Sequence, residues 1–137
     1  MIDWDRLKNQ LKVDEGFRAC VYQCSAGKAT VGYGHNLEDE EMPEHIASAL
    51  LEWKYMKVHE QLSDWQWYCE LDDYRKEIII NMAFNVGVNG LLRFKKMINA
   101  IMDRDYQKAA DEMVNSNWYN QVGFRAVRLV ERMRIGQ

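Results

Sequence analysis

The sequence has few cysteines, one proline and no long apolar run. The nearest approach to such a run, Ile78-Ile79-Ile80, is soon interrupted by Asn81 and Asn85, well short of the ~20 apolar residues that a membrane-spanning helix needs. The first residues lack the apolar core and the small-residue cleavage site of a signal peptide. We therefore expect a protein that is made and folded in the cytoplasm and has no stable membrane insertion.

The three cysteines, Cys20, Cys24 and Cys69, form an odd set without a CxxC pair, which argues against a disulfide scaffold. Cys20 and Cys24 together with His35 could suggest zinc, but a fourth ligand at a suitable spacing is missing. We expect neither a metal nor any other cofactor.

The net charge of −3 is spread unevenly. Residues 1–89 hold nine basic and 16 acidic residues, whereas residues 90–137 hold nine and five. The C-terminal part is therefore the better surface for a polyanion, although an ordinary solvated helix surface has a similar composition. No basic run is interleaved with aromatic residues, so a nucleic-acid partner is not expected.

The length of 137 residues is that of one domain, large enough to bury roughly two-thirds of its unfolded surface. The spacing of apolar residues predicts a first helix from Asp3 to about Asp14, with Gly16 as its stop. Strand-favouring residues dominate residues 17–35 around a turn at 25–27, which predicts a small antiparallel β lobe.

The rest of the chain reads as helical. Pro43, the only proline, suits the first turn of a long helix over residues 43–62. Four later helices are predicted from the apolar spacing. The first follows Asp72 and ends near Gly87, and the second carries Leu91, Phe94, Ile98 and Ile101. The third covers about residues 105–115, and after a short turn around Trp118 the last carries Val127, Val130 and Met133. The predicted class is α+β and mostly helical, with two lobes in one folding unit.

Three polar side chains near the N-terminus have a spacing that suits chemistry. Glu15 lies where the first helix should end, eight residues separate it from Cys24, and five more separate Cys24 from Thr30. A carboxylic acid close to a glycine-turned hairpin can act as a proton donor, which makes Glu15 the candidate acid.

These segments resemble the phage-type lysozymes of glycoside hydrolase family 24. The matching stretches are Asp14-Glu15-Gly16-Phe17-Arg18 with Tyr22, the run from Thr30 through Gly32-Tyr33-Gly34-His35, and the blocks 81–87 and 118–128. The resemblance spans about residues 4–135. It implies a lysozyme-like fold with a β-hairpin lobe at about 15–40, a connecting helix at 43–62 and a helical lobe at 63–137.

The resemblance also implies roles for the three polar residues. Glu15 would donate the proton, and the residue at position 24 would lie across the scissile bond and position the attacking water together with Thr30, giving inversion. The family most often has Asp where this chain has Cys24. A thiolate is a strong nucleophile, so Cys24 could instead attack the anomeric carbon with retention. It could also be inert, with Ser25 as a substitute polar group.

Further candidates surround this site. Arg18 is expected close to Glu15, bracing it or a neighbouring backbone group. The resemblance places His35 at the substrate site in a structural or supporting role. Amide and phenol side chains suit sugar hydroxyls and acetamido groups, and those expected to bind the substrate are Tyr22, Asn85, Asn120 and Gln121.

Some of these side chains have other readings. Asn85 could equally cap a helix that ends at Gly87. Trp118 and Phe94 fit a core better than a binding site. The sequence does not decide whether Trp65 and Trp67 form an exposed aromatic surface.

The activity implied by the resemblance is that of a muramidase. It would hydrolyse the β-1,4 bonds between N-acetylmuramic acid and N-acetylglucosamine in peptidoglycan. Such a protein would accumulate as a monomer in the cytoplasm of the infected cell and reach the wall through holin lesions, causing lysis. Two alternatives stay open: a non-catalytic peptidoglycan-binding module weakened at Cys24, and a Cys-His hydrolase using Cys24 and His35.

Overall fold

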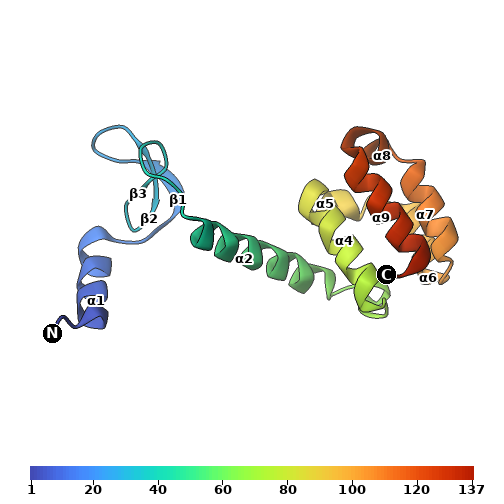
Figure 1. Ribbon diagram of the computed structural model, residues 1–137, viewed down its shortest axis with the longest axis horizontal. Coiled ribbons are helices and arrows are strands. Elements are labelled where there is room, and N and C mark those ends of the chain that lie inside the picture. Colours follow the sequence, from blue (N-terminus) through green and yellow to red (C-terminus); the bar gives the residue numbers. More distant parts are fainter. The chain divides into compact units, whose positions relative to one another are not determined.

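The computed structural model describes all 137 residues as two compact units, which we call unit 1 (Met1–Ala49) and unit 2 (Leu50–Gln137). Unit 1 contains α1 (Trp4–Glu15), β1 (Arg18–Gln23), β2 (Ala29–Gly32) and β3 (His35–Asn36), and helix α2 (Glu44–Leu62) begins in unit 1 and continues into unit 2 (Figure 1). A small β lobe and a mostly helical remainder confirm the predicted α+β class.

Helix α1 has the ends that its sequence predicts. The Asp3 carboxylate accepts a hydrogen bond of 2.9 Å from the Arg6 backbone N–H and caps the helix start. Gly16 follows the last helical residue with φ +72°, a conformation that side chains other than glycine's disfavour, and its N–H donates to the Lys12 carbonyl at 3.0 Å. The helix therefore ends at Glu15.

The three strands form one antiparallel sheet in the order β1-β2-β3. Tyr22 lies opposite Thr30 in the first pair, and Thr30 lies opposite Asn36 in the second. The pairing of β1 with β2 is irregular between Arg18 and Tyr22, as at a β-bulge. Thr30 is thus on the central strand.

The β1–β2 turn is closed by two backbone hydrogen bonds. The Gly27 N–H donates to the Cys24 carbonyl at 2.8 Å, and the Cys24 N–H donates to the Lys28 carbonyl at 2.9 Å. Gly27 has φ +77°, which is typical of a turn followed by a left-handed residue in a hairpin. The predicted turn at residues 25–27 is confirmed.

Unit 1, taken by itself, has almost no buried core. Thr30, 3% exposed, is the one side chain among residues 1–49 that is buried. The apolar side chains of α1, including Trp4, Leu7 and Leu11, are exposed within the unit. Its local structure is therefore maintained mainly by caps, turns and strand pairing.

Unit 2 contains residues 50–62 of α2 and seven further helices. These are α3 (Gln66–Cys69), α4 (Asp73–Val86), α5 (Val88–Leu91), α6 (Lys95–Met102), α7 (Tyr106–Val114), α8 (Asn117–Val122) and α9 (Phe124–Ile135). Helix α9 packs on both α4 and α7, and α7 also packs on α6 (Figure 1). None of the chain's helices combines the length and apolar character needed to cross a membrane.

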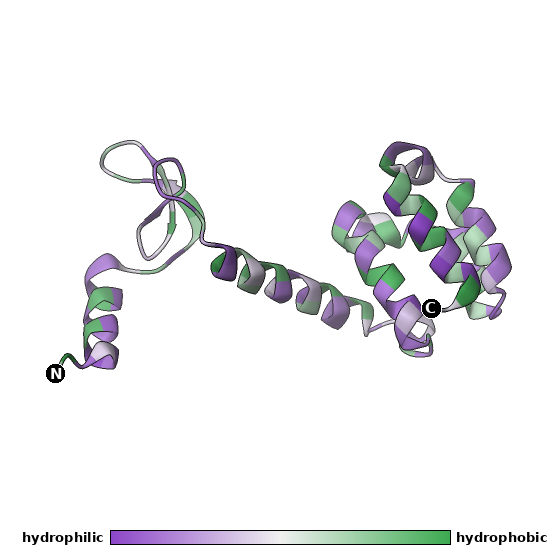
Figure 2. Cartoon of the chain, in the orientation of Figure 1, coloured by the Kyte–Doolittle hydropathy of each residue, from purple (hydrophilic) through white to green (hydrophobic).

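The apolar core belongs to unit 2. Helix α9 has apolar and polar residues on different sides, so one face is suited to the core (Figure 2). The fully buried side chains include Leu62, Tyr68, Ile78, Ile79, Met82, Leu91, Met97, Met113 and Met133. The predicted helix from Asp72 to Gly87 is confirmed, with the Asp72 carboxylate accepting from the Arg75 N–H at 3.0 Å.

Three parts of the helical prediction need correction. The single helix predicted through Leu91, Phe94 and Ile101 is divided into α5 and α6, because Phe94 has ψ +60° and leaves the helical conformation. The Phe94 ring instead packs edge-on against Trp118, with centroids 6.2 Å apart. Helix α3 was not predicted, and Trp118 lies in the short helix α8 rather than in a turn.

Arg75 connects three helices of unit 2. Its guanidinium donates to the Met133 carbonyl at 2.8 Å and to the Arg134 carbonyl at 3.3 Å, near the C-terminal end of α9. The same group lies 3.7 Å from the centroid of the Tyr106 ring. A Cβ atom at Gly136 would lie 2.8 Å from this guanidinium, and the φ of +78° there disfavours residues other than glycine.

Tyr68 should make the stability of the protein sensitive to alkaline pH. Burial of its phenol, together with the charge of Cys69, raises its pKa to about 12. The unfolded chain releases this proton near pH 10, so the contribution is complete below pH 10 and is lost as the pH rises toward 12. We expect the free energy of unfolding to fall by roughly 2–3 kcal/mol over this range because of Tyr68.

Denaturant unfolding between pH 9 and pH 12 measures this effect. Tyr68→Phe should remove the pH-dependent part, although it also removes the 2.7 Å hydrogen bond to His59 at every pH. Tyr74→Phe is the matched control, because Tyr74 is 52% exposed. Equal pH slopes for wild type and Tyr68→Phe would contradict the assignment.

Candidate active site

Glu15 faces the turn between β2 and β3. A Cβ atom built on Gly34 would lie 3.4 Å from Glu15 Oε2, so the carboxylate rests directly over the Gly34 backbone. Gly34 has φ +85°, which disfavours any other residue. The carboxylate itself forms no ion pair or hydrogen bond within the chain and remains available to a ligand.

Aromatic and cationic side chains fix the end of α1 against the same turn. The ring centroids of Phe17 and Tyr33 are 5.5 Å apart, and the Lys12 ammonium lies 5.6 Å from the Tyr33 ring. Since Phe17 follows Gly16 directly, these contacts position the helix end that carries Glu15.

Cys24 begins the β1–β2 turn, and its sulfur faces hydrogen-bond donors. The backbone N–H groups of Lys28 and Ala26 lower the pKa of the Cys24 thiol from its ordinary value, partial desolvation opposes them, and the Thr30 hydroxyl adds a smaller lowering effect. Such donors favour the thiolate over the thiol. The structure therefore brings Cys24 and Thr30 together.

Thr30 is held in place by its own hydrogen bond. Its hydroxyl donates to the Lys28 carbonyl at 2.9 Å. Because a hydroxyl has one proton, Thr30 can donate either to that carbonyl or to the Cys24 thiolate at any moment. While it donates to the carbonyl, its oxygen lone pairs remain free to accept.

His35 begins β3, next to Gly34. Its Nδ1 lies 3.1 Å from the Glu40 carboxylate, which orients the ring. Its Nε2 is buried and has no hydrogen-bond partner. Because Nε2 is not accessible and Glu40 orients the ring through Nδ1, the geometry favours the structural role for His35.

The structure does not pair Arg18 with Glu15 in the way the sequence suggested. The Arg18 guanidinium lies over the Tyr22 ring, with a distance of 4.6 Å from its carbon to the ring centroid. It forms no ion pair with any carboxylate of the chain. Arg18 and Tyr22 lie on the same strand, and the stacked pair also restricts the phenol that was expected to contact sugar.

The other candidate substrate residues belong to unit 2. Asn85, near the end of α4, accepts a hydrogen bond of 3.1 Å from the Trp118 indole N–H. It does not cap the helix, because the Gly87 N–H closes α4 on the Ala83 carbonyl. Trp118 is buried, as predicted. Asn120 and Gln121 are exposed on α8, and their amides form no hydrogen bond within the chain.

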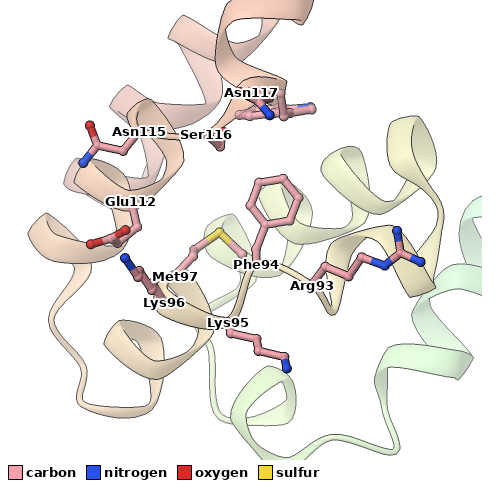
Figure 3. Close-up of a pocket in the computed structure, with 10 residues that line it drawn as sticks. Arg93, Phe94, Lys95, Lys96, Met97, Glu112, Asn115, Ser116 and Asn117 are labelled. Carbon is pink, nitrogen blue, oxygen red and sulfur yellow. The ribbon is translucent and has the colours of Figure 1, made fainter.

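A pocket of about 580 Å³ in unit 2 lies beside Trp118. The Phe94 ring lies between the Ser116–Asn117 segment and the start of α6 (Figure 3). Three basic side chains, Arg93, Lys95 and Lys96, line it together with Glu112. None of the sugar-binding candidates lines this pocket, so the sequence did not point to it.

Sequence reasoning missed several groups around the unit 1 site. The backbone donors beside Cys24 depend on how the turn is closed, and no residue type signals them. Glu40 belongs to the acidic run 38–41, in which nothing distinguishes the partner of His35. Gly34 was visible within the Gly32-Tyr33-Gly34-His35 motif, but its contact with Glu15 was not.

Comparison with known proteins extends over most of the chain. A family model described as phage lysozyme matches residues 12–134. Two Dictyostelium discoideum proteins are similar, Probable T4-type lysozyme 1 at 30% identity and Probable T4-type lysozyme 2 at 27%, each over 95% of this chain and 94% of its own length. The pre-baseplate central spike protein Gp5 of Enterobacteria phage T4 is 26% identical over 90% of this chain and 26% of its own length.

Proposed function

The chain belongs to the phage lysozyme family, and from this premise we propose that it is a muramidase. It hydrolyses the β-1,4 bonds between N-acetylmuramic acid and N-acetylglucosamine in bacterial peptidoglycan. Its biological role is lysis of the host cell, with accumulation in the cytoplasm and release to the wall through holin lesions.

The observation that carries the proposal is the grouping of acid, thiol and hydroxyl around one small sheet. The Glu15 carboxylate rests over Gly34 in the β2–β3 turn. Cys24 and Thr30 meet at the β1–β2 turn of the same sheet. An acid and a separate water-activating group are the two functions that glycoside hydrolysis requires.

In the proposed mechanism Glu15 donates its proton to the leaving glycosidic oxygen. The absence of an internal partner for the carboxylate leaves it free to reach that oxygen. Cys24, as the thiolate, accepts a proton from the attacking water, and the Thr30 oxygen accepts a hydrogen bond from the same water. In unit 2, the exposed amides of Asn120 and Gln121 are available to bind sugar substituents.

A clearing assay with purified sacculi tests the proposal. A muramidase lowers the turbidity and releases muropeptides with new reducing ends, which mass spectrometry identifies. A binding module would sediment with the sacculi without clearing them. Release of stem peptides, with the glycan intact, would instead support a Cys-His hydrolase.

The configuration of the new reducing end tests the role of Cys24. Water positioned by Cys24 and Thr30 attacks opposite the leaving group, so a β-linked substrate should give the α-anomer first. A covalent Cys24 adduct, hydrolysed in a second step, would give the β-anomer. Proton NMR of early products, recorded before mutarotation, measures the ratio. An initial β-anomer, or a mass adduct on Cys24, would contradict water positioning.

A further inference from the structure

Helix α6 has a second face that is only partly covered: Ile98 is half-buried against the core, and its neighbours on that face are exposed. Its buried residues are Met97, Ala100 and Ile101. Residues three or four apart share one side of a helix, and the remaining side carries Lys95, Ile98 with Asn99, and Met102. Helix α6 packs on α7 and also contacts α3.

The second face of α6 borders a depression of about 390 Å³, which we call the tryptophan depression. Its other side is formed by Trp65, which precedes α3, and by Trp67 of α3, which is largely buried. This volume is within the roughly 300–1,000 Å³ of small-ligand sites. Its lining residues are Trp65, Trp67, Leu92, Lys95, Ile98, Asn99 and Met102. Trp65 is 44% exposed and Met102 is 62% exposed, so a large apolar surface meets solvent here.

The polar groups of the tryptophan depression have no partners within the chain. The indole N–H groups of Trp65 and Trp67 form no hydrogen bond, in contrast to that of Trp118, which donates to Asn85. The Asn99 amide is likewise free, and the Lys95 ammonium forms no ion pair. An apolar floor with a few convergent polar groups is the composition of a ligand site.

We propose that the tryptophan depression is a second binding site for peptidoglycan, in which an N-acetylated amino-sugar ring packs on Trp65. The C–H face of a pyranose is attracted to the electron-rich face of an indole. Asn99 and the indole N–H groups match the acetamido group. Lys95 matches the carboxylates of the acidic peptide that muramic acid carries. The identity of this ligand rests on the proposed function.

The position of Lys95 supports an extended substrate over a single sugar. Lys95 lines both the tryptophan depression and the basic pocket beside Trp118. Its side chain points away from the Ser116–Asn117 segment that borders that pocket (Figure 3). A polymer with sugar rings and regularly spaced carboxylates could occupy both depressions at once.

Binding to purified sacculi, measured by sedimentation, tests the site in a Glu15→Gln background that does not degrade the wall. Adding Trp65→Ala should raise the apparent Kd about tenfold, the upper range for loss of one aromatic contact. The matched control is Trp53→Ala, which removes a 60% exposed tryptophan from α2 and should leave the Kd unchanged. Circular dichroism checks that each variant is folded.

A second experiment uses a neutral probe and does not depend on a truncating variant. Titration with N-acetylchitotetraose should shift the indole N–H signals of Trp65 and Trp67 in NMR spectra and leave that of Trp53 in place. Lys95→Glu should weaken binding to sacculi but not to this uncharged oligosaccharide. Unchanged sacculus binding by folded Trp65→Ala, or unshifted Trp65 and Trp67 signals, would overturn the proposal. If these bindings occur while wild type releases no muropeptides, the muramidase proposal fails and the binding site stands.

Discussion

Replacing Glu15 with glutamine should reduce the clearing of sacculi by a factor of at least about 100 while leaving the fold intact. Glutamine has nearly the same shape as glutamate but has no acidic proton to donate, and general-acid catalysis contributes roughly 10²–10⁴ in rate. The carboxylate has no partner within the chain, so the amide leaves no broken hydrogen bond behind. Turbidity at matched protein concentration measures the effect.

The neighbouring acid provides the control for this experiment. Asp14→Asn makes the same chemical change one residue earlier, at an exposed position of the same helix end. It should retain nearly full activity. If folded Glu15→Gln cleared sacculi at more than about a tenth of the wild-type rate, Glu15 would not be the proton donor.

Substitution of Cys24 should have the second-largest effect. Cys24→Ala removes the group that accepts the proton from water, and we expect a loss of about 100-fold, at the lower end of the range for general-base catalysis. Cys24→Asp restores a carboxylate and should keep or raise the activity. If Cys24→Ala cleared sacculi as fast as wild type, Cys24 would have no catalytic role.

The pH profiles of these variants give a second readout. Donors around the sulfur lower the pKa of the Cys24 thiol. Cys24→Asp replaces this thiol with a carboxylate, a group that ionises in a different range, so the pH profile of the variant should be displaced from that of wild type. Coincident profiles would mean that the ionisation of residue 24 does not control the rate.

Capping residues and glycines allowed most helix ends to be predicted from the sequence. Asp3, Gly16 and Asp72 fix helix ends through interactions with residues at most four positions away, so the sequence displays them directly. The candidate site at Glu15, Cys24 and Thr30 followed from the resemblance to the phage-type lysozymes, and the structure brings Cys24 and Thr30 together in the hairpin.

The features that the sequence did not predict depend on distant partners or on short segments. Phe94 leaves the helical conformation where it packs on Trp118, 24 positions later in the chain. Helix α3 is one turn long, too short for an apolar pattern to emerge. Arg18 was expected close to Glu15. In strand β1, however, its guanidinium lies over the ring of Tyr22, four residues later on the same strand.

The division of buried surface between the units has a consequence for how substitutions accumulate. Glu15, Cys24 and Thr30 belong to the unit in which Thr30 is the one buried side chain, whereas the apolar core belongs to unit 2. Under the proposed mechanism, exchanges at positions 15 and 24 alter reactivity without opening a cavity, and mutational tolerance there is limited by selection on chemistry. Met82 and Ile79 are instead limited by stability, because truncating either buried side chain lowers the free energy of unfolding by about 2–5 kcal/mol whatever its effect on activity. Evolution can thus exchange a thiol for a carboxylate in the hairpin while the helical core continues to fold unchanged.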